Sequence, residues 1–304
     1  CRKRLRIGLA FALPQVFKSF QQFHLAAFQI FPEFAKQYLQ KLNYDYVEFS
    51  FDELHQQDFD FGKKLDGLLV NAGMIDENTV SNLINKSYPI VAIQHNIPSL
   101  YPFHQVIPDL MVSFIKAIAV IRENGVQEMT LLYPKYNTHI ERMEVFRQAA
   151  LCQNYPSNAL HEITTEWLPG DLGQLAGYKL GLQALNNHSP GKTYFSVSDI
   201  VSCGIVSAFF EKKMQPGKDF QLISFDNLEA DQPCFFAKPT MSSIDFPKKD
   251  IIRRAIQLIE TETATPSGEK YVIEIPCALI ERETFCRQQK KLNKAPCLQS
   301  AVPK

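Results

Sequence analysis

Asp226 and Asn227 stand directly after the short apolar run at 221–225. A run of this length bounded by polar residues is typical of a buried strand. A carboxylate accepts hydrogen bonds, and an amide both donates and accepts them, so this pair is suited to holding the polar groups of a ligand. The sequence therefore predicts that this strand delivers hydrogen-bonding groups to its carboxyl end.

Other expected strands also end in residues that can line a site. In open parallel sheets, ligands bind beyond the carboxyl ends of the strands, because loops and helix N-termini converge there. The residues at the corresponding positions are Gln94 and His95 after 89–94, Ser198 and Asp199 after 193–197, and Pro14 with Phe17 after the first strand. We predict one ligand site at this shared edge, in a cleft between two domains.

Each candidate also has a structural interpretation, which the sequence leaves open. Asp199 begins an expected helix, and aspartate is a preferred N-cap residue. Asp226 and Asn227 are typical of an Asx turn. His95 can be a loop histidine without a function, and Arg142 can be a solvated charge on a helix surface.

Motifs of catalytic and metal sites are absent. GxGxxG, GxxxxGK[ST], HExxH and GxSxG do not occur, and the seven histidines have no metal-ligand spacing. No histidine and cysteine pair indicates a nucleophile with its base. We therefore expect a binding protein that is not an enzyme and needs neither a cofactor nor a metal.

Composition narrows the class of protein further. The 304 residues carry 32 basic and 32 acidic side chains, so the chain by itself is a poor candidate for DNA binding. Seven cysteines without a CxxC spacing indicate reduced thiols and a cytoplasmic protein. No apolar run approaches the roughly 20 residues that span a bilayer, which predicts no membrane association. Cys1 in place of methionine indicates a processed protein or a fragment.

The elements that must position these residues alternate between short apolar runs and segments of helical period, the pattern of a parallel α/β sheet. Before the Asn124-Gly125 stop, the expected strands are 5–13, 45–51, 66–70 and 89–94, and the expected helices are 23–44 (kinked or begun at Pro32), 75–87 and 109–124, the last entered by a long loop. After it, the strands are 129–133, 161–168, 193–197, 221–225, 240–245 and 270–282, and the helices are 138–153, 171–187, 199–213 and 247–261.

This pattern predicts two Rossmann-like parallel-sheet lobes joined by a hinge that the chain crosses more than once. The expected N-terminal lobe comprises 1–125 plus 245–268, the C-terminal lobe comprises 126–243 plus 270–286, and 287–304 form a disordered tail.

Several segments resemble the ligand-sensing domain of the lactose-repressor/galactose-repressor family, whose fold is that of type I periplasmic sugar-binding proteins. The segment 195–227 resembles the family's strand, Ser-Asp pair, glycine-containing helix and strand ending in Phe-Asp-Asn. The segment 239–259 resembles the family's Pro-x-Leu-Thr-Thr-Val segment and the helix after it. The segment 275–284 resembles the family's closing Leu-Pro-x-x-Leu-Ile-x-Arg-x-Ser, and 65–70 and 141–150 fit as well.

The resemblance implies roles for individual residues. The family's sugar contacts fall on Arg142, Asp226, and Ser198 or Asp199, as well as on the loop after the first strand. Asp109 matches an aspartate that enters a helix, and Phe246 lies near a position that lines the cleft. The sequence departs from the family at Gln94-His95 (usually Asp-Arg), Leu172 (usually an aromatic that stacks on the sugar), Val145 (usually Gly) and Leu110 (usually Asn).

The resemblance also implies partners and a mechanism. Two lobes would close on a sugar or related metabolite and thereby change how two protomers pack in a homodimer. The apolar surfaces of the helices at 23–44 and 247–261 are candidates for the dimer interface, and ordinary core packing is the alternative for both. The family's DNA-reading helix-turn-helix is not in this sequence, so contact with DNA is expected only through a missing N-terminal domain. The alternative is an exported type I solute-binding protein of a sugar transporter.

Overall fold

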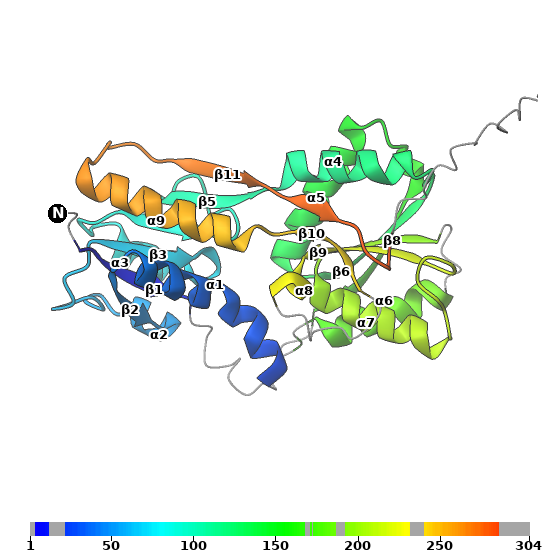
Figure 1. The fold of residues 1–304 in the computed structure, drawn as a ribbon, viewed down its shortest axis with the longest axis horizontal. Coiled ribbons are helices and arrows are strands. Elements are labelled where there is room, and N and C mark those ends of the chain that lie inside the picture. Colours follow the sequence, from blue (N-terminus) through cyan, green and yellow to red (C-terminus); the bar gives the residue numbers. More distant parts are fainter. Residues whose placement is uncertain are drawn as a thin grey trace, which may run out of the picture.

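The computed structural model describes residues 4–11, 22–167, 171, 173–186, 192–231 and 240–285. Pro14, Phe17, Leu172 and the expected tail at 287–304 lie outside these residues. Two six-stranded sheets form two lobes that lie side by side (Figure 1). This arrangement confirms the predicted fold class of two α/β lobes.

The first sheet has the strand order β11-β5-β4-β3-β1-β2, and every pair in it is parallel. Its strands are β1 (Arg6–Ala10), β2 (Asp45–Phe49), β3 (Gly67–Asn71), β4 (Ile90–Ile93), β5 (His104–Asp109) and β11 (Val272–Pro276). The helices of this lobe are α1 (Gln22–Lys41), α2 (Phe51–Leu54), η2 (Ala72–Met74), α3 (Glu77–Leu83) and α9 (Lys248–Ala264). The helix α1 runs through Pro32, which therefore does not mark its start.

The second sheet has the order β12-β10-β9-β8-β6-β7 and is parallel except for β12, which is antiparallel to β10. Its strands are β6 (Met129–Lys135), β7 (Leu160–Glu166), β8 (Thr193–Ser196), β9 (Gln221–Asp226), β10 (Ser242–Asp245) and β12 (Ala278–Ile280). The helices of this lobe are α4 (Leu110–Glu123), α5 (Asn137–Cys152), η3 (Ser157–Ala159), α6 (Gln174–Asn186), α7 (Asp199–Glu211) and α8 (Leu228–Asp231).

Three predictions about the course of the chain were wrong. The expected loop before residue 109 contains the strand β5. Pro108 makes this segment resemble a loop in the sequence, but in the structure it pairs with Ile275 of β11. The helix α4 belongs to the second lobe and not to the first, because the buried ring of Phe114 packs against Phe146, Phe195 and Phe225.

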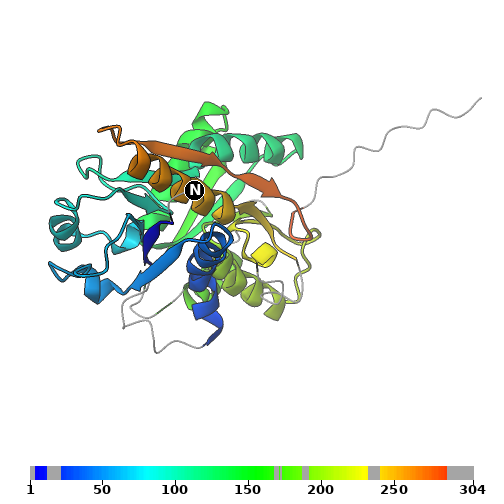
Figure 2. The same ribbon diagram turned by 60° about the vertical axis from the view of Figure 1, so that its left-hand side comes forward.

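The third correction concerns 270–282, which the sequence predicts as one strand of the second lobe. It is two strands, β11 in the first sheet and β12 in the second, separated by the buried Cys277. The chain therefore passes between the lobes at β5–α4, at β10–α9 and at β11–β12. In the turned view, this last segment runs along the molecule from one lobe into the other (Figure 2).

Two glycines allow α6 and α7 to pack closely. A Cβ atom on Gly204 would lie 1.9 Å from the carbonyl oxygen of Gln174, and one on Gly177 would lie 1.9 Å from the carbonyl oxygen of Val201. Both distances are far below van der Waals contact, so only glycine fits at either position. This packing fixes the N-terminus of α7, where Ser198 and Asp199 lie.

Candidate functional site

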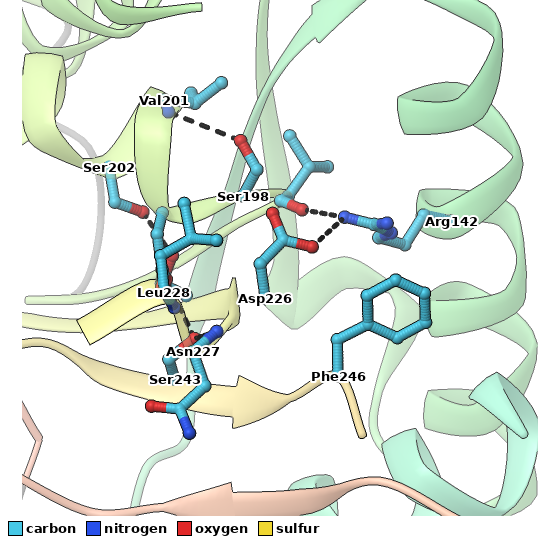
Figure 3. Close-up of polar contacts among 12 residues, drawn as sticks. Arg142, Ser198, Val201, Ser202, Asp226, Asn227, Leu228, Ser243 and Phe246 are labelled. Carbon is cyan, nitrogen blue, oxygen red and sulfur yellow. Dashed lines mark hydrogen bonds and ion pairs between the residues drawn. The ribbon is translucent and has the colours of Figure 1, made fainter. Parts of the chain in front are cut away.

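Arg142 and Asp226 face each other in the second lobe, at the carboxyl edge of its sheet (Figure 3). Nη1 of Arg142, on α5, lies 3.4 Å from Oδ1 of Asp226 at the end of β9 and also donates to the carbonyl oxygen of Val197. The guanidinium lies over the ring of Phe225, 4.0 Å from its centre. A charge-assisted hydrogen bond is usually about 2.7–2.9 Å long. The longer Arg142–Asp226 distance leaves both charged groups able to take a further polar partner.

The backbone of Asp226 directs its carboxylate toward this position. Its φ of 105° is in a region that non-glycine residues seldom adopt, and Asn227 follows with a φ of 50°. Burial raises the pKa of Asp226 above its ordinary value, although the charges of Arg142 and Lys248 act in the opposite direction. The side chain keeps 20% of its exposure, so it is accessible to a small ligand.

Asn227 does not point into the same space as Asp226. Its Nδ2 donates to Asp245 Oδ1 at 2.8 Å, its Oδ1 accepts from Arg282 at 2.7 Å, and its backbone N–H donates to Ser243. The side chain is buried and turned away from Arg142 (Figure 3). The two consecutive positive φ values thus separate Asp226, which faces Arg142, from Asn227, which connects β9 to β10.

Ser198 and Asp199 are both engaged within the second lobe. The N-cap of α7 is Ser198, whose Oγ accepts from the N–H of Val201, so the alternative that Asp199 is the cap is wrong. The buried carboxylate of Asp199 accepts from Leu228 N–H at 2.7 Å and from Ser243 Oγ at 2.8 Å. Burial and the nearby charge of Asp226 raise the pKa of Asp199 to about 6.

From the first lobe, Gln94 and His95 follow β4 as predicted. Gln94 has a φ of 89°, and both side chains are half-buried. Burial, and then the positive charge of Arg142, lower the pKa of His95 to about 4. His95 is therefore a neutral ring within electrostatic reach of the guanidinium of the opposite lobe. A residue of the first lobe and a residue of the second thus lie close enough for the charge of one to act on the other.

Asp109 and Phe246 both make contacts within the protein. Asp109 is the N-cap of α4, and its Oδ1 accepts from the N–H of Val112 at 3.0 Å. Phe246 is buried between Phe31 of α1 and Phe225 of β9, with ring centres 5.4 and 6.1 Å apart respectively. Phe246 thus fills the hinge between the lobes beside Arg142 (Figure 3).

Sequence reasoning missed an aromatic group at the same edge of the second sheet. Trp167, which follows β7, stacks on Tyr136, which precedes α5, with ring centres 4.9 Å apart. The edge of His139 packs against both rings, and its Nδ1 is buried without a hydrogen-bond partner. Burial, together with the charge of Arg142, lowers the pKa of His139 to about 3. The signal was the single tryptophan of the chain at the end of an expected strand.

Neither metal ligands nor a membrane span emerge from the part of the chain that the structure describes. It brings no three His, Cys, Asp or Glu side chains together as metal ligands. Within the same residues, no helix has the length and apolar character needed to cross a bilayer. What the arrangement offers is a charged pair, neutral imidazoles and an aromatic surface, which are means of binding an organic molecule.

Known proteins are similar to this chain in sequence and in fold. A protein named HTH-type transcriptional regulator LacR from Lactobacillus helveticus is 22% identical over 222 residues, covering 70% of this chain and 64% of the relative. The HTH-type transcriptional repressor PurR of Klebsiella pneumoniae is 24% identical over 226 residues, covering 73% and 64%. The chain thus spans less than two thirds of the length of these relatives.

Among solved structures, a LacI family transcriptional regulator from Enterococcus faecium with bound ribose superposes with a TM-score of 0.71 and 16% identity, covering 93% of this chain and all of that one. The lac repressor dimer bound to operator and an anti-inducer gives a TM-score of 0.72 at 16% identity, covering 93% and 95%. These likenesses confirm the fold and the resemblance to the ligand-sensing domains of this regulator family. Residues 118–285 match the periplasmic binding protein-like domain, and the chain belongs to that family.

Proposed function

We propose that this chain is the ligand-sensing part of a transcriptional regulator, which binds a small hydroxyl-bearing metabolite between its lobes without transforming it. The observation that carries the proposal is the Arg142–Asp226 pair, held at the carboxyl edge of the second sheet with a contact of 3.4 Å. A guanidinium donates two parallel hydrogen bonds, and a carboxylate accepts hydroxyl protons, so together they fit neighbouring hydroxyl groups.

The stacked rings of Tyr136 and Trp167 supply an apolar surface near these charges. Tyr136 is 46% exposed, so one ring of the pair is open to a ligand. Sugars and planar heterocycles present both an apolar face and polar edges, and an aromatic ring beside a charged pair suits either shape. The relatives that are named as regulators, LacR and PurR, favour this reading over an exported solute-binding protein.

Ligand binding would act through closure of the lobes. His95 and Arg142 come from opposite lobes, so a molecule that contacts both prefers the closed arrangement. A ligand shifts such an equilibrium only by its difference in affinity for the two states. In a homodimer of a longer chain with a DNA-binding domain, this shift would change the spacing of the DNA readers, and the regulated partner would be DNA.

Thermal unfolding against a panel of compounds tests the proposal. The panel contains D-ribose, other pentoses and hexoses, and purine bases, each added in excess. A ligand at about 100 times its Kd adds roughly 2.7 kcal/mol to the free energy of unfolding. The response is expected to disappear in Arg142→Ala and Asp226→Ala and to persist in Arg147→Ala, whose guanidinium pairs with Glu162 instead. A response that survives in both site variants contradicts the proposed site.

A further inference from the structure

Lys248 is a buried lysine whose ammonium group has three partners. Its Nζ donates to the carbonyl oxygen of Asp226 at 2.6 Å and to that of Phe246 at 3.3 Å. It also forms an ion pair with Asp231 Oδ2 at 2.8 Å. The side chain of Lys248 is 4% exposed and that of Asp231 is 12% exposed, so water screens this ion pair little.

These contacts join the two lobes. Lys248 is the first residue of α9, which packs against β3, β4 and β5 of the first lobe. Asp226 ends β9 and Asp231 ends α8, both in the second lobe. One ammonium group of the first lobe thus holds two residues of the second at the β10–α9 crossing, where the lobes must hinge.

A buried position at a helix N-terminus is unfavourable for a lysine. A cation at a helix N-terminus is unfavourable because it faces the positive end of the helix dipole. Burial of a lysine adds to this cost unless the charge is paired. Since neither the helix nor the core favours a lysine here, the contacts to Asp226 and Asp231 are what retain it.

The bond to the Asp226 carbonyl bears directly on the candidate site. Asp226 has a φ of 105°, and such a backbone conformation persists only where the surroundings hold it. The peptide group held by Lys248 belongs to the same residue whose carboxylate faces Arg142. A movement of α9 relative to the second sheet therefore acts on the orientation of that carboxylate.

We propose that Lys248 is an interlobe latch and a positioning residue, which couples the orientation of the Asp226 carboxylate to the angle between the lobes. The latch extends the proposed function to its regulation. It rests on the proposed function only because it takes Asp226 as a ligand contact. A change in the angle between the lobes would then change the orientation of the carboxylate that faces the ligand.

The test is a distance measurement on the ligand-free chain by double electron–electron resonance. Spin labels are attached to keto amino acids at the positions of Phe61 and Leu175, which are 86% and 52% exposed and lie in different lobes. This labelling leaves the native cysteines untouched. The distance distribution is compared between the wild type, Lys248→Met, Asp231→Asn and the control Lys218→Met, which removes an exposed lysine of the second lobe.

We expect a narrow distribution in the wild type and in Lys218→Met, and a broadened or displaced one in Lys248→Met. Asp231→Asn keeps both carbonyl partners of Lys248 and is expected to change the distribution in the same direction by less. Folded variants that reproduce the wild-type distribution overturn the latch. If Lys248→Met fails to fold, the distance distribution of Asp231→Asn alone tests the latch.

A second measurement separates positioning from general support of the fold. The pKa of Asp226, followed by ¹³C NMR of its carboxyl group, is expected to rise in Lys248→Met, because the nearby positive charge lowers it in the wild type. An unchanged value contradicts the positioning role. Neither experiment contains a ligand, so the two proposals can fail separately. If no compound in the panel stabilises the protein but the variants change the distance distribution, the proposed function is overturned and the latch is supported.

Discussion

The carboxylate of Asp226 lies 3.4 Å from the guanidinium of Arg142, and 84 positions of sequence separate the two residues. The geometry depends on an unusual backbone at Asp226 and on the carbonyl oxygen of Val197, which accepts from the same guanidinium nitrogen. Among the described residues, neither charge is neutralised by a short ion pair. Arg142 is therefore a charge that acts on ionisable groups of both lobes, and its removal is expected to have effects at a distance.

Substitution Arg142→Met is expected to raise the pKa of both His95 and His139. The positive charge of Arg142 contributes to the low values of about 4 and about 3, and burial keeps both below the ordinary 6.5 after it is removed. Two-dimensional NMR of the imidazole protons against pH measures both. Arg147→Met, which removes a guanidinium that pairs with Glu162, serves as the control. If the pKa of His95 is the same in Arg142→Met as in the wild type, the two lobes do not approach each other at this point in solution.

The buried Asp199 predicts a pH dependence of stability. Its folded pKa of about 6 lies above the ordinary 3.8, so the folded state binds the proton more tightly than the unfolded chain does. The contribution of this group to stability therefore rises as the pH falls from about 7 to about 4, by roughly 2–3 kcal/mol. Urea unfolding at several pH values measures the slope, which Asp199→Asn is expected to lose.

Asp250→Asn is the matched control for this slope, because Asp250 is exposed and pairs with Arg253 at the surface. It is expected to follow the wild type throughout the pH range. If Asp199→Asn keeps the wild-type slope, the pH dependence arises elsewhere.

Gly204→Ala is expected to destabilise the second lobe. The new methyl group would lie 1.9 Å from the carbonyl oxygen of Gln174, so α6 and α7 must separate. Overpacking of this kind costs about 1–3 kcal/mol or more. Thermal unfolding measures the loss. Ser207→Ala, at an exposed position of the same helix, is expected to change stability by less than about 0.5 kcal/mol.

Trp167 is a natural probe of the cleft, since it is the single tryptophan of the chain. A compound that stabilises the protein in the panel is expected to change its fluorescence, because Trp167 stacks on the partly exposed Tyr136. Tyr136→Ala is expected to weaken such a compound about 3- to 10-fold, the equivalent of about 0.5–1.5 kcal/mol for one aromatic contact. Equal affinity in the variant would place the ligand away from these rings.

Much of the architecture could be predicted because short apolar runs that end in polar residues determine parallel strands. The strand β5 could not, since Pro108 within HQVIPD is typical of a loop, and only its neighbour β11 completes it. The crossing between β11 and β12 was hidden because the residues on both sides of Cys277 are equally apolar. Local pattern carries no information about which sheet a strand joins.

The candidate site could also be predicted only in part. The resemblance pointed to Arg142 and Asp226, and the structure brings them together, while their ligand-binding role stays a prediction. The opposite orientation of Asn227 depends on two consecutive positive φ values that no side-chain pattern indicates. Lys248 was not anticipated either, because its partners Asp226 and Asp231 are 22 and 17 positions away and no residue pattern links them to the lysine.

Within the described residues, the chain passes between the lobes three times, and this limits how the protein can be divided into fragments. The first sheet needs β11, at Val272–Pro276, while β12 of the second begins at Ala278, so a single residue separates strands of different lobes. No single cut in the polypeptide releases a lobe with all of its strands. Separate expression of either half is therefore expected to give an incomplete sheet with an exposed edge, and a self-contained lobe would have to be built by splicing its segments together with new linkers.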